Sequence, residues 1–212
     1  VKDAGLDSGG AGGIVLEVTA VDGRIGVDAE VVGDAGDDDT AFASVYVSGD
    51  AGSGILSAAP NLWVVNAAIG LDANVSTSSG AETGSAAAPN AGVAGIELLG
   101  TATGCVIGSS SHPQLRTWVA GNGGHGIAAT GTSVRIRAVD VGFNLHREPI
   151  SNKGYGVLVE GVGASPTFDA DTKVGASGNC GVRVGYDCIQ PVNDSSLLLY
   201  KNTGASSDDD ES

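Results

Sequence analysis

Short apolar runs that begin with glycine recur along the chain. A Gly-(Ile/Val) pair opens such a run at six places, and successive pairs are 41, 41, 31, 30 and 25 residues apart. The pairs are Gly13-Ile14, Gly54-Ile55, Gly95-Ile96, Gly126-Ile127, Gly156-Val157 and Gly181-Val182. Apolar residues at every second position are typical of a strand with one buried face. We therefore expect a strand at each pair, with Val157, Val159, Val182 and Val184 pointing inward.

Further apolar runs lie between these pairs, and turn residues precede several of them. The runs are Leu62–Val65, Cys105–Ile107 and Val134–Val141. Turns rich in Asn and Gly precede three strands, and they contain Asn122, Asn152 and Asn179. Gly and Asn tolerate positive φ, so we expect them to turn the chain sharply. Asparagines at equivalent turns are expected to stack into a hydrogen-bonded ladder.

A single repeat of this kind cannot bury its own apolar face, so the repeats must stack around a shared core. The pattern resembles the right-handed parallel β-helix family, whose members carry Asn-x-x-Gly-(Ile/Val)-x-(Ile/Val) units. That group includes pectate-lyase-like domains, phage tailspikes and large adhesion proteins. The resemblance is clearest over residues 95–190 and weaker over 13–94, where the loops are longer. It implies an all-β, right-handed parallel β-helix, and it says little about activity.

The expected organisation is a lead-in over residues 1–12, a β-helix over 13–200 and an acidic tail over 201–212. Leu197–Tyr200 is expected to cap the last coil. The chain begins at Val1 and contains no Met, so we expect a processed product or a fragment. It has no apolar run long enough to span a membrane as a helix. We expect an extracellular or cell-surface location.

The negative net charge of the chain limits the kinds of partner that it can bind. The formal net charge is −15, and residues 1–115 hold 14 acidic but only 2 basic residues. Such a surface repels nucleic acid and anionic lipid, which bind through Lys and Arg. We predict no cofactor, with calcium as the alternative, because that ion prefers several carboxylate oxygens on a loop. The densest acidic loop holds Asp34, Asp37, Asp38 and Asp39, without the spacing of an EF-hand.

Three cysteines allow one disulfide at most. Cys180 and Cys188 are close in sequence and are predicted to pair in an oxidising compartment, whereas Cys105 is predicted to be a buried free thiol. Two glycosylation sequons begin at Asn74 and Asn193, and they matter only in a eukaryotic secretory pathway.

The strongest hint of catalysis is Gly124-His125-Gly126 followed by Arg135-Ile136-Arg137. These segments resemble fragments of polygalacturonases, which also need paired acidic residues. No Asp occurs between Asp72 and Asp140, so we interpret His125 as an exposed turn residue. A lyase-like groove would need basic and acidic side chains such as Arg135, Arg137, Arg147, Lys153, Asp169, Asp171 and Lys173, which we interpret instead as solvated loop charges.

The two tryptophans, Trp63 and Trp118, either stack on sugars if exposed or fill coil corners if buried. With no catalytic set evident, we expect a noncatalytic structural or adhesive protein, such as a building block of a filament or envelope. Its expected partners are itself or other extracellular chains, and glycans. The alternative is a fragment of a carbohydrate-active β-helix enzyme (a lyase or hydrolase) or of a phage tailspike. A solenoid exposes strand edges at its ends, so assembly contacts are expected there.

Overall fold

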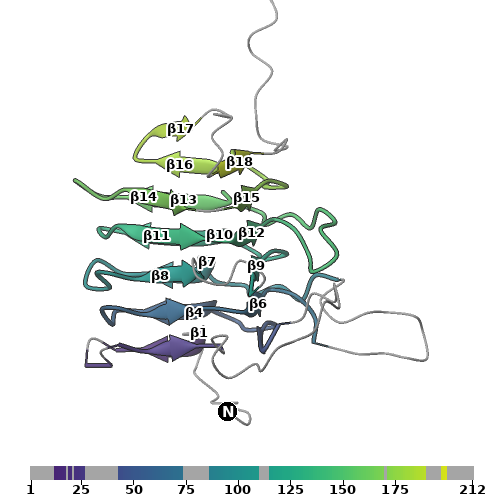
Figure 1. The fold of residues 1–212 in the computed structure, drawn as a ribbon, viewed down its shortest axis with the longest axis horizontal. Coiled ribbons are helices and arrows are strands. Elements are labelled where there is room, and N and C mark those ends of the chain that lie inside the picture. Colours follow the sequence, from purple (N-terminus) through teal and green to yellow (C-terminus); the bar gives the residue numbers. More distant parts are fainter. Residues whose placement is uncertain are drawn as a thin grey trace, which may run out of the picture.

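The chain winds into a stack of coils in a computed structural model (Figure 1). The structure describes residues 12–17, 19–20, 22–26, 43–73, 86–109, 115–169, 171–189 and 197–199. The stack climbs from the purple N-terminal coil at β1 to the yellow-green coil at β16–β18 (Figure 1). Each of the first five coils contributes one strand to each of three sheets, which we name sheets A, B and C, whereas the last coil adds two strands to sheet A, one to sheet C and none to sheet B among the described residues.

The strands of each sheet come from successive coils. Sheet A contains β1 (Gly12–Leu16), β4 (Ser53–Ser57), β7 (Ala94–Leu98), β10 (His125–Thr130), β13 (Val157–Glu160), β16 (Val182–Val184) and β17 (Asp187–Ile189). Sheet B contains β2 (Arg24–Ile25), β5 (Trp63–Val64), β8 (Val106–Gly108), β11 (Val134–Arg137) and β14 (Pro166–Asp169). Sheet C contains β3 (Val45–Val47), β6 (Ala67–Ile69), β9 (Thr117–Val119), β12 (Val139–Val141), β15 (Thr172–Val174) and β18 (Leu197–Leu199). All neighbouring strands are parallel except β16 and β17, which confirms the predicted all-β parallel β-helix.

The Gly-(Ile/Val) pairs set the register of sheet A. Ile14, Ile55, Ile96, Ile127, Val157 and Val182 pair in that order from coil to coil. Each sequence interval is therefore one coil, and the different spacings reflect loops of different length. Ile55, Ile96 and Ile127 are fully buried in one continuous core. Burying each such side chain contributes about 1.5–3 kcal/mol. Val157, Val159 and Val182 also lie in this core, and Val184 packs against it, as predicted.

Buried asparagines form the expected ladder in the turns that precede sheet A. Asn90 Nδ2 donates to Asn122 Oδ1 at 3.0 Å, and Asn122 Nδ2 donates to Asn152 Oδ1 at 2.9 Å. Asn152 pairs next with Ser177, so the expectation that Asn179 would be the following rung was wrong. Asn90 is a further rung, in a region where the sequence showed no Asn turn.

The glycines of the Gly-(Ile/Val) pairs leave room for this ladder. A Cβ on Gly54 would lie 2.6 Å from Asn90 Nδ2, and a Cβ on Gly95 would lie 2.6 Å from Asn122 Nδ2. Neither glycine has positive φ. Their role is to permit close approach by the next coil. In the turn before β10, Gly121 has a φ of 72°, as expected for a turn glycine.

The sharp corners between the strands of sheets B and C are formed by residues outside the Gly-(Ile/Val) pairs. Asn66, Ala138 and Asp171 stand directly before β6, β12 and β15 and have φ of 50°, 50° and 56°. Asn and Asp adopt this left-handed region more easily than other residues with a Cβ, whereas Ala138 occupies it at a steric cost.

The last coil departs from the rest. Leu197–Leu199 was predicted to cap the stack, but it continues sheet C as β18, parallel to β15. It is β17 that folds back antiparallel on β16, with Arg183 opposite Cys188. This reversal covers an edge of sheet A that would otherwise be open to another chain.

Candidate functional site

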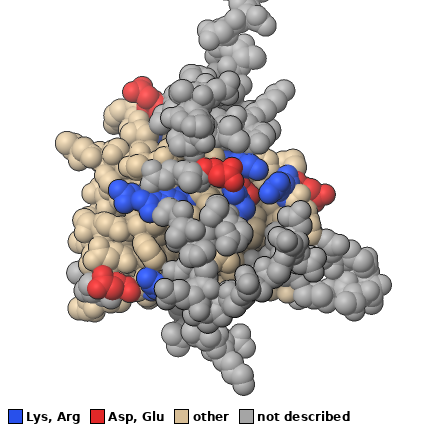
Figure 2. Space-filling view, in the orientation of Figure 1, with Lys and Arg blue, Asp and Glu red and all other residues tan. Residues whose placement is uncertain are grey.

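Charged and polar side chains gather on the outer surfaces of the solenoid. Figure 2 shows Lys and Arg across the middle of one face, with Asp and Glu beside them. Three polar clusters, one on each sheet, differ in burial and in what their groups contact.

The cluster on sheet C is a buried ion pair with a third member. Arg116 donates to both carboxylate oxygens of Asp140, with Nε to Oδ2 at 2.9 Å. It also donates to the Asp171 carboxylate at 2.8 Å and to the Asp171 backbone carbonyl at 2.7 Å. Burial alone would lower the pKa of Arg116, but the hydrogen bond and charge of Asp140, with help from Asp171, raise it overall. Asp140 is fully buried, so this cluster ties coils together and is closed to a substrate.

Trp118 lies on the same outer side of sheet C, and it is also buried. Its neighbours form a second apolar cluster separate from the solenoid core, namely Ala68, Leu71, Ala120 and Leu145, with Ala43, Tyr46 and Ile150 packed against them. Trp118 is 1% exposed, so of its two predicted roles the structure supports packing. Sheet C is buried on both faces around β6, β9 and β12.

The cluster on sheet A is a stack of three side chains from three successive coils. The rings of His125 and Tyr155 are stacked with centroids 5.3 Å apart. Arg183 lies 5.0 Å from the centre of the Tyr155 ring and donates to its hydroxyl at 2.7 Å. His125 Nδ1 accepts a hydrogen bond from the Tyr155 backbone N–H at 3.0 Å.

These contacts change the interpretation of His125. Burial lowers its pKa and Arg183 lowers it further, although Glu160 and Glu97 act in the opposite direction. The ring is thus held neutral, with Nδ1 as an acceptor. His125 begins β10 and is half-buried, so the interpretation as an exposed turn residue was wrong.

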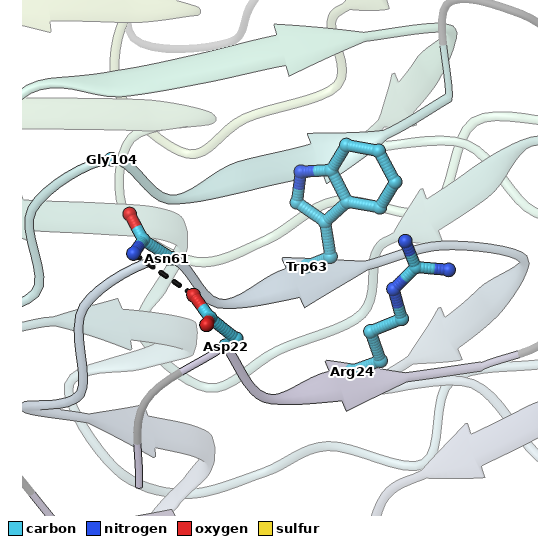
Figure 3. A pocket seen from close by; sticks show the side chains of 5 residues that line it. All are labelled: Asp22, Arg24, Asn61, Trp63 and Gly104. Carbon is cyan, nitrogen blue, oxygen red and sulfur yellow. Dashed lines mark hydrogen bonds between the residues drawn. The ribbon is translucent and has the colours of Figure 1, made fainter. Parts of the chain in front are cut away.

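The cluster on sheet B surrounds a hollow in the surface of the solenoid. Asp22, Arg24, Asn61, Trp63 and Gly104 line a pocket of about 350 Å³ (Figure 3). Asn61 Nδ2 donates to Asp22 Oδ1 at 2.9 Å. The Arg24 guanidinium carbon lies 4.6 Å from the centre of the Trp63 ring. Trp63 is partly exposed, so it remains a candidate for stacking on a sugar.

The turn residues of this pocket come from three successive coils. Asp22 and Asn61 have φ of 58° and 56°, and Gly104 has φ of 71°. A Cβ on Gly104 would lie 2.4 Å from Asn61 Oδ1, so glycine gives the Asn61 side chain its room. Sequence reasoning missed Asp22, Arg24 and Asn61, because only the coiling brings them beside Trp63.

The other predicted residues are spread over the molecule. Arg135, Arg137 and Asp169 lie on strands of sheet B, and Lys173 lies on sheet C. Arg147 and Lys153 are exposed between coils. Arg135 and Arg137 are two residues apart on β11 and share the outer face of sheet B, whereas Lys173 lies on sheet C and Asp171 joins the sheet C cluster.

The cysteines follow the prediction as far as the structure describes them. Cys105 is a buried free thiol whose pKa is raised by burial. Cys180 is in a disulfide. The side chain of Cys188 lies outside the described part, so its pairing with Cys180 stays a prediction.

The proposed calcium residues Asp34, Asp37, Asp38 and Asp39 also lie outside the described residues, as do Asn74 and Asn193 of the sequons. Among the described residues, no three His, Cys, Asp or Glu side chains are arranged to hold a metal ion. Within the same residues, no helix has the length and apolar character of a membrane span.

No protein-family model matches the chain, and neither a curated protein nor a solved structure is significantly similar to it.

Proposed function

We propose that this chain is a noncatalytic, extracellular structural or adhesive solenoid, of the kind found in the pectate-lyase-like superfamily. The observation that carries the proposal is the engagement of its acid–base groups in contacts between coils. Arg116 donates hydrogen bonds to the carboxylates of Asp140 and Asp171, and the backbone N–H of Tyr155 donates to Nδ1 of His125. Groups held in this way stabilise the stack, and their positions would have to change before they could move a proton.

The disulfide at Cys180 supports an extracellular location, because disulfides persist mainly in oxidising compartments. The acidic composition supports exposure to solvent along the sides of the solenoid.

Assembly is proposed to use one end of the stack or both. Among the described residues, the end strands β1, β2 and β3 each pair with a strand on one side only, and so do β17, β14 and β18 at the other end. Open strand edges favour pairing with another chain. A second copy of this chain, or an adjoining domain of a longer protein, is the proposed partner.

Two exposed valines allow a matched test of this assembly. Val15 lies on the end strand β1 and Val162 lies in the loop between β13 and β14. A lysine on an edge strand opposes edge pairing. We expect Val15→Lys to weaken self-association by about 10-fold or more, which corresponds to roughly 1.4 kcal/mol, and Val162→Lys to leave it unchanged. Light scattering and electron microscopy over a concentration series provide the measurement. A monomer at every concentration would overturn the assembly proposal.

The noncatalytic part has its own test. Purified protein is incubated with pectin, alginate and neutral glucans, and new reducing ends or unsaturated products are measured. We expect none. Turnover that disappears in Arg135→Ala would show that the chain is a carbohydrate-active enzyme instead.

A further inference from the structure

The pocket on sheet B has the chemistry of a sugar-binding site. Its wall is the partly exposed indole of Trp63, and its rim carries Asp22, Arg24 and Asn61 (Figure 3). We propose that this pocket binds one or two residues of a neutral glycan. The proposal goes beyond the structural role above, since it assigns a ligand to the outer face of sheet B, whereas assembly is proposed to use the strand edges at the ends of the stack.

Trp63 supplies the apolar contact. A sugar ring presents C–H groups on one face and hydroxyls around its edge. An indole offers a large flat apolar surface with little conformational entropy to lose, which suits contact with such a face. The Arg24 guanidinium carbon lies over the Trp63 ring, 4.6 Å from its centre, so Arg24 covers one face of the indole. The sugar is proposed to contact the other face.

Asp22 and Asn61 supply complementary polar contacts. A carboxylate accepts hydrogen bonds from hydroxyl groups, and an amide both donates and accepts them. Asn61 Nδ2 donates to Asp22 Oδ1 at 2.9 Å, which fixes the two side chains relative to each other. Asn61 also donates its backbone N–H to the Thr103 carbonyl at 2.7 Å, so the next coil holds the turn. Two adjacent hydroxyls of a sugar fit an acceptor and a donor fixed in this way.

The lining of the pocket favours neutral over acidic glycans. Asp22 and Arg24 contribute one charge of each sign, so the lining has no net charge. The Asp22 carboxylate would repel an acidic sugar placed beside it, whereas a neutral hexose meets no such repulsion.

The test uses the two indole N–H signals of the chain. The protein has two tryptophans, and Trp118 is buried, so its signal serves as an internal reference. Labelled protein is titrated with cellohexaose, mannohexaose and hexagalacturonate, and Trp63→Phe assigns the two signals. We expect at least one neutral hexasaccharide to shift the Trp63 signal and not the Trp118 signal. The expected Kd is on the order of 1 mM, because a shallow site contacts few ligand atoms.

Variants identify the pocket as the site. Trp63→Ala and Asp22→Ala are each expected to weaken binding about 10-fold or more, whereas Trp63→Phe retains an aromatic ring and part of the affinity. Because the Trp63 variants lack the indole signal, their affinities are measured from the backbone amide signals of Asn61 and Gly104. Tyr186→Ala is the matched control, since Tyr186 is 96% exposed and lies outside the pocket. An unchanged Trp118 signal verifies that each variant is folded.

Three results overturn the proposal: no shift with either neutral hexasaccharide, binding of hexagalacturonate alone, or full affinity in folded Trp63→Ala. Self-association is expected to be unaffected by Trp63→Ala, so failure of the glycan site and failure of the assembly proposal are distinguishable.

Discussion

Two buried polar systems join neighbouring coils, and they do so in different ways. The ladder of Asn90, Asn122 and Asn152 is neutral and places one amide in each coil at equivalent turn positions. The cluster of Arg116, Asp140 and Asp171 is charged and lies on the outer side of sheet C. It also crosses three successive coils. Arg116 and Asp171 stand at equivalent positions, directly before β9 and β15, whereas Asp140 lies in the middle of β12.

This difference determines how much stability each system loses when one of its side chains is removed. Each rung of the ladder keeps backbone partners when a neighbour is lost; Asn90 Nδ2 also donates to the Val47 carbonyl, and Asn152 Oδ1 also accepts from the Asn122 backbone N–H. A buried ion pair has no such reserve, because removal of one partner leaves an uncompensated charge away from water.

The largest expected effect is therefore in the charged cluster. Asp140→Ala leaves Arg116 buried with the carboxylate of Asp171, whose side chain is 56% exposed, and with the Asp171 backbone carbonyl, which carries no charge to offset it. We expect a loss of about 3–5 kcal/mol in the free energy of unfolding, measured by urea denaturation. Asp171→Asn is the matched control, because Asn tolerates the φ of 56°, and it is expected to cost about 1 kcal/mol or less, since the charge of Asp171 is already solvated.

A double variant separates the charge from the shape. Replacing Arg116 with Met and Asp140 with Leu removes both charges together, and should recover most of the stability lost in Asp140→Ala. A double variant as unstable as the single variant would mean that packing, and not the unpaired charge, accounts for the loss.

The ladder is expected to show the next largest effect. Asn122→Ala removes the side-chain bonds to Asn90 and Asn152 and should cost about 2 kcal/mol. Asn179→Ala is the control, because Asn179 is exposed and lies outside the ladder, and it should change stability by less than about 0.5 kcal/mol. Equal losses in the two variants, by the same urea measurement, would contradict the assignment of the ladder.

A feature of this fold can be predicted from the sequence when equivalent residues recur in successive coils. The register of sheet A follows from the Gly-(Ile/Val) pairs, because equivalent residues in successive coils must stack on each other. The ladder was partly predictable for the same reason. Ser177 replaces the expected Asn179, because the third turn places a different residue opposite Asn152.

The polar clusters carry no such signal. Arg116 is 24 residues from Asp140 and 55 from Asp171, and no repeat relates the three. In the Trp63 pocket, Asp22 is 39 residues from Asn61, and the number of loop residues in each coil determines that they meet. Such clusters depend on where whole coils lie relative to each other, so a local pattern cannot reveal them.

A glycine substitution tests the link between the ladder and the repeat. A Cβ on Gly95 would lie 2.6 Å from Asn122 Nδ2, so Gly95→Ala should displace that rung and cost about 1.5 kcal/mol. In Gly23→Ala the nearest atom would lie at 3.6 Å, an ordinary contact, so little change is expected. Thermal unfolding of the pair provides the comparison, and a tolerated alanine at Gly95 would show that the ladder does not require the glycine.

Asn66 sharpens the comparison, because it is a buried asparagine that belongs to neither system. Its side chain is fully buried, yet neither its nitrogen nor its oxygen has a hydrogen-bond partner among the described residues. An unpaired buried amide costs free energy that a paired one does not.

The φ of Asn66 is 50°, which suits glycine, so Asn66→Gly removes the unpaired amide without straining the corner. We expect a gain of about 1 kcal/mol in the free energy of unfolding, the smallest effect in this series and the only increase. Asn66→Ala removes the same amide but keeps a Cβ at a left-handed corner, which Ala tolerates less well than Asn, so it should be less stable than Asn66→Gly. A loss in both variants would mean that the Asn66 amide is satisfied, by a buried water for example, and that it stabilises this corner as the ladder stabilises the turns before sheet A.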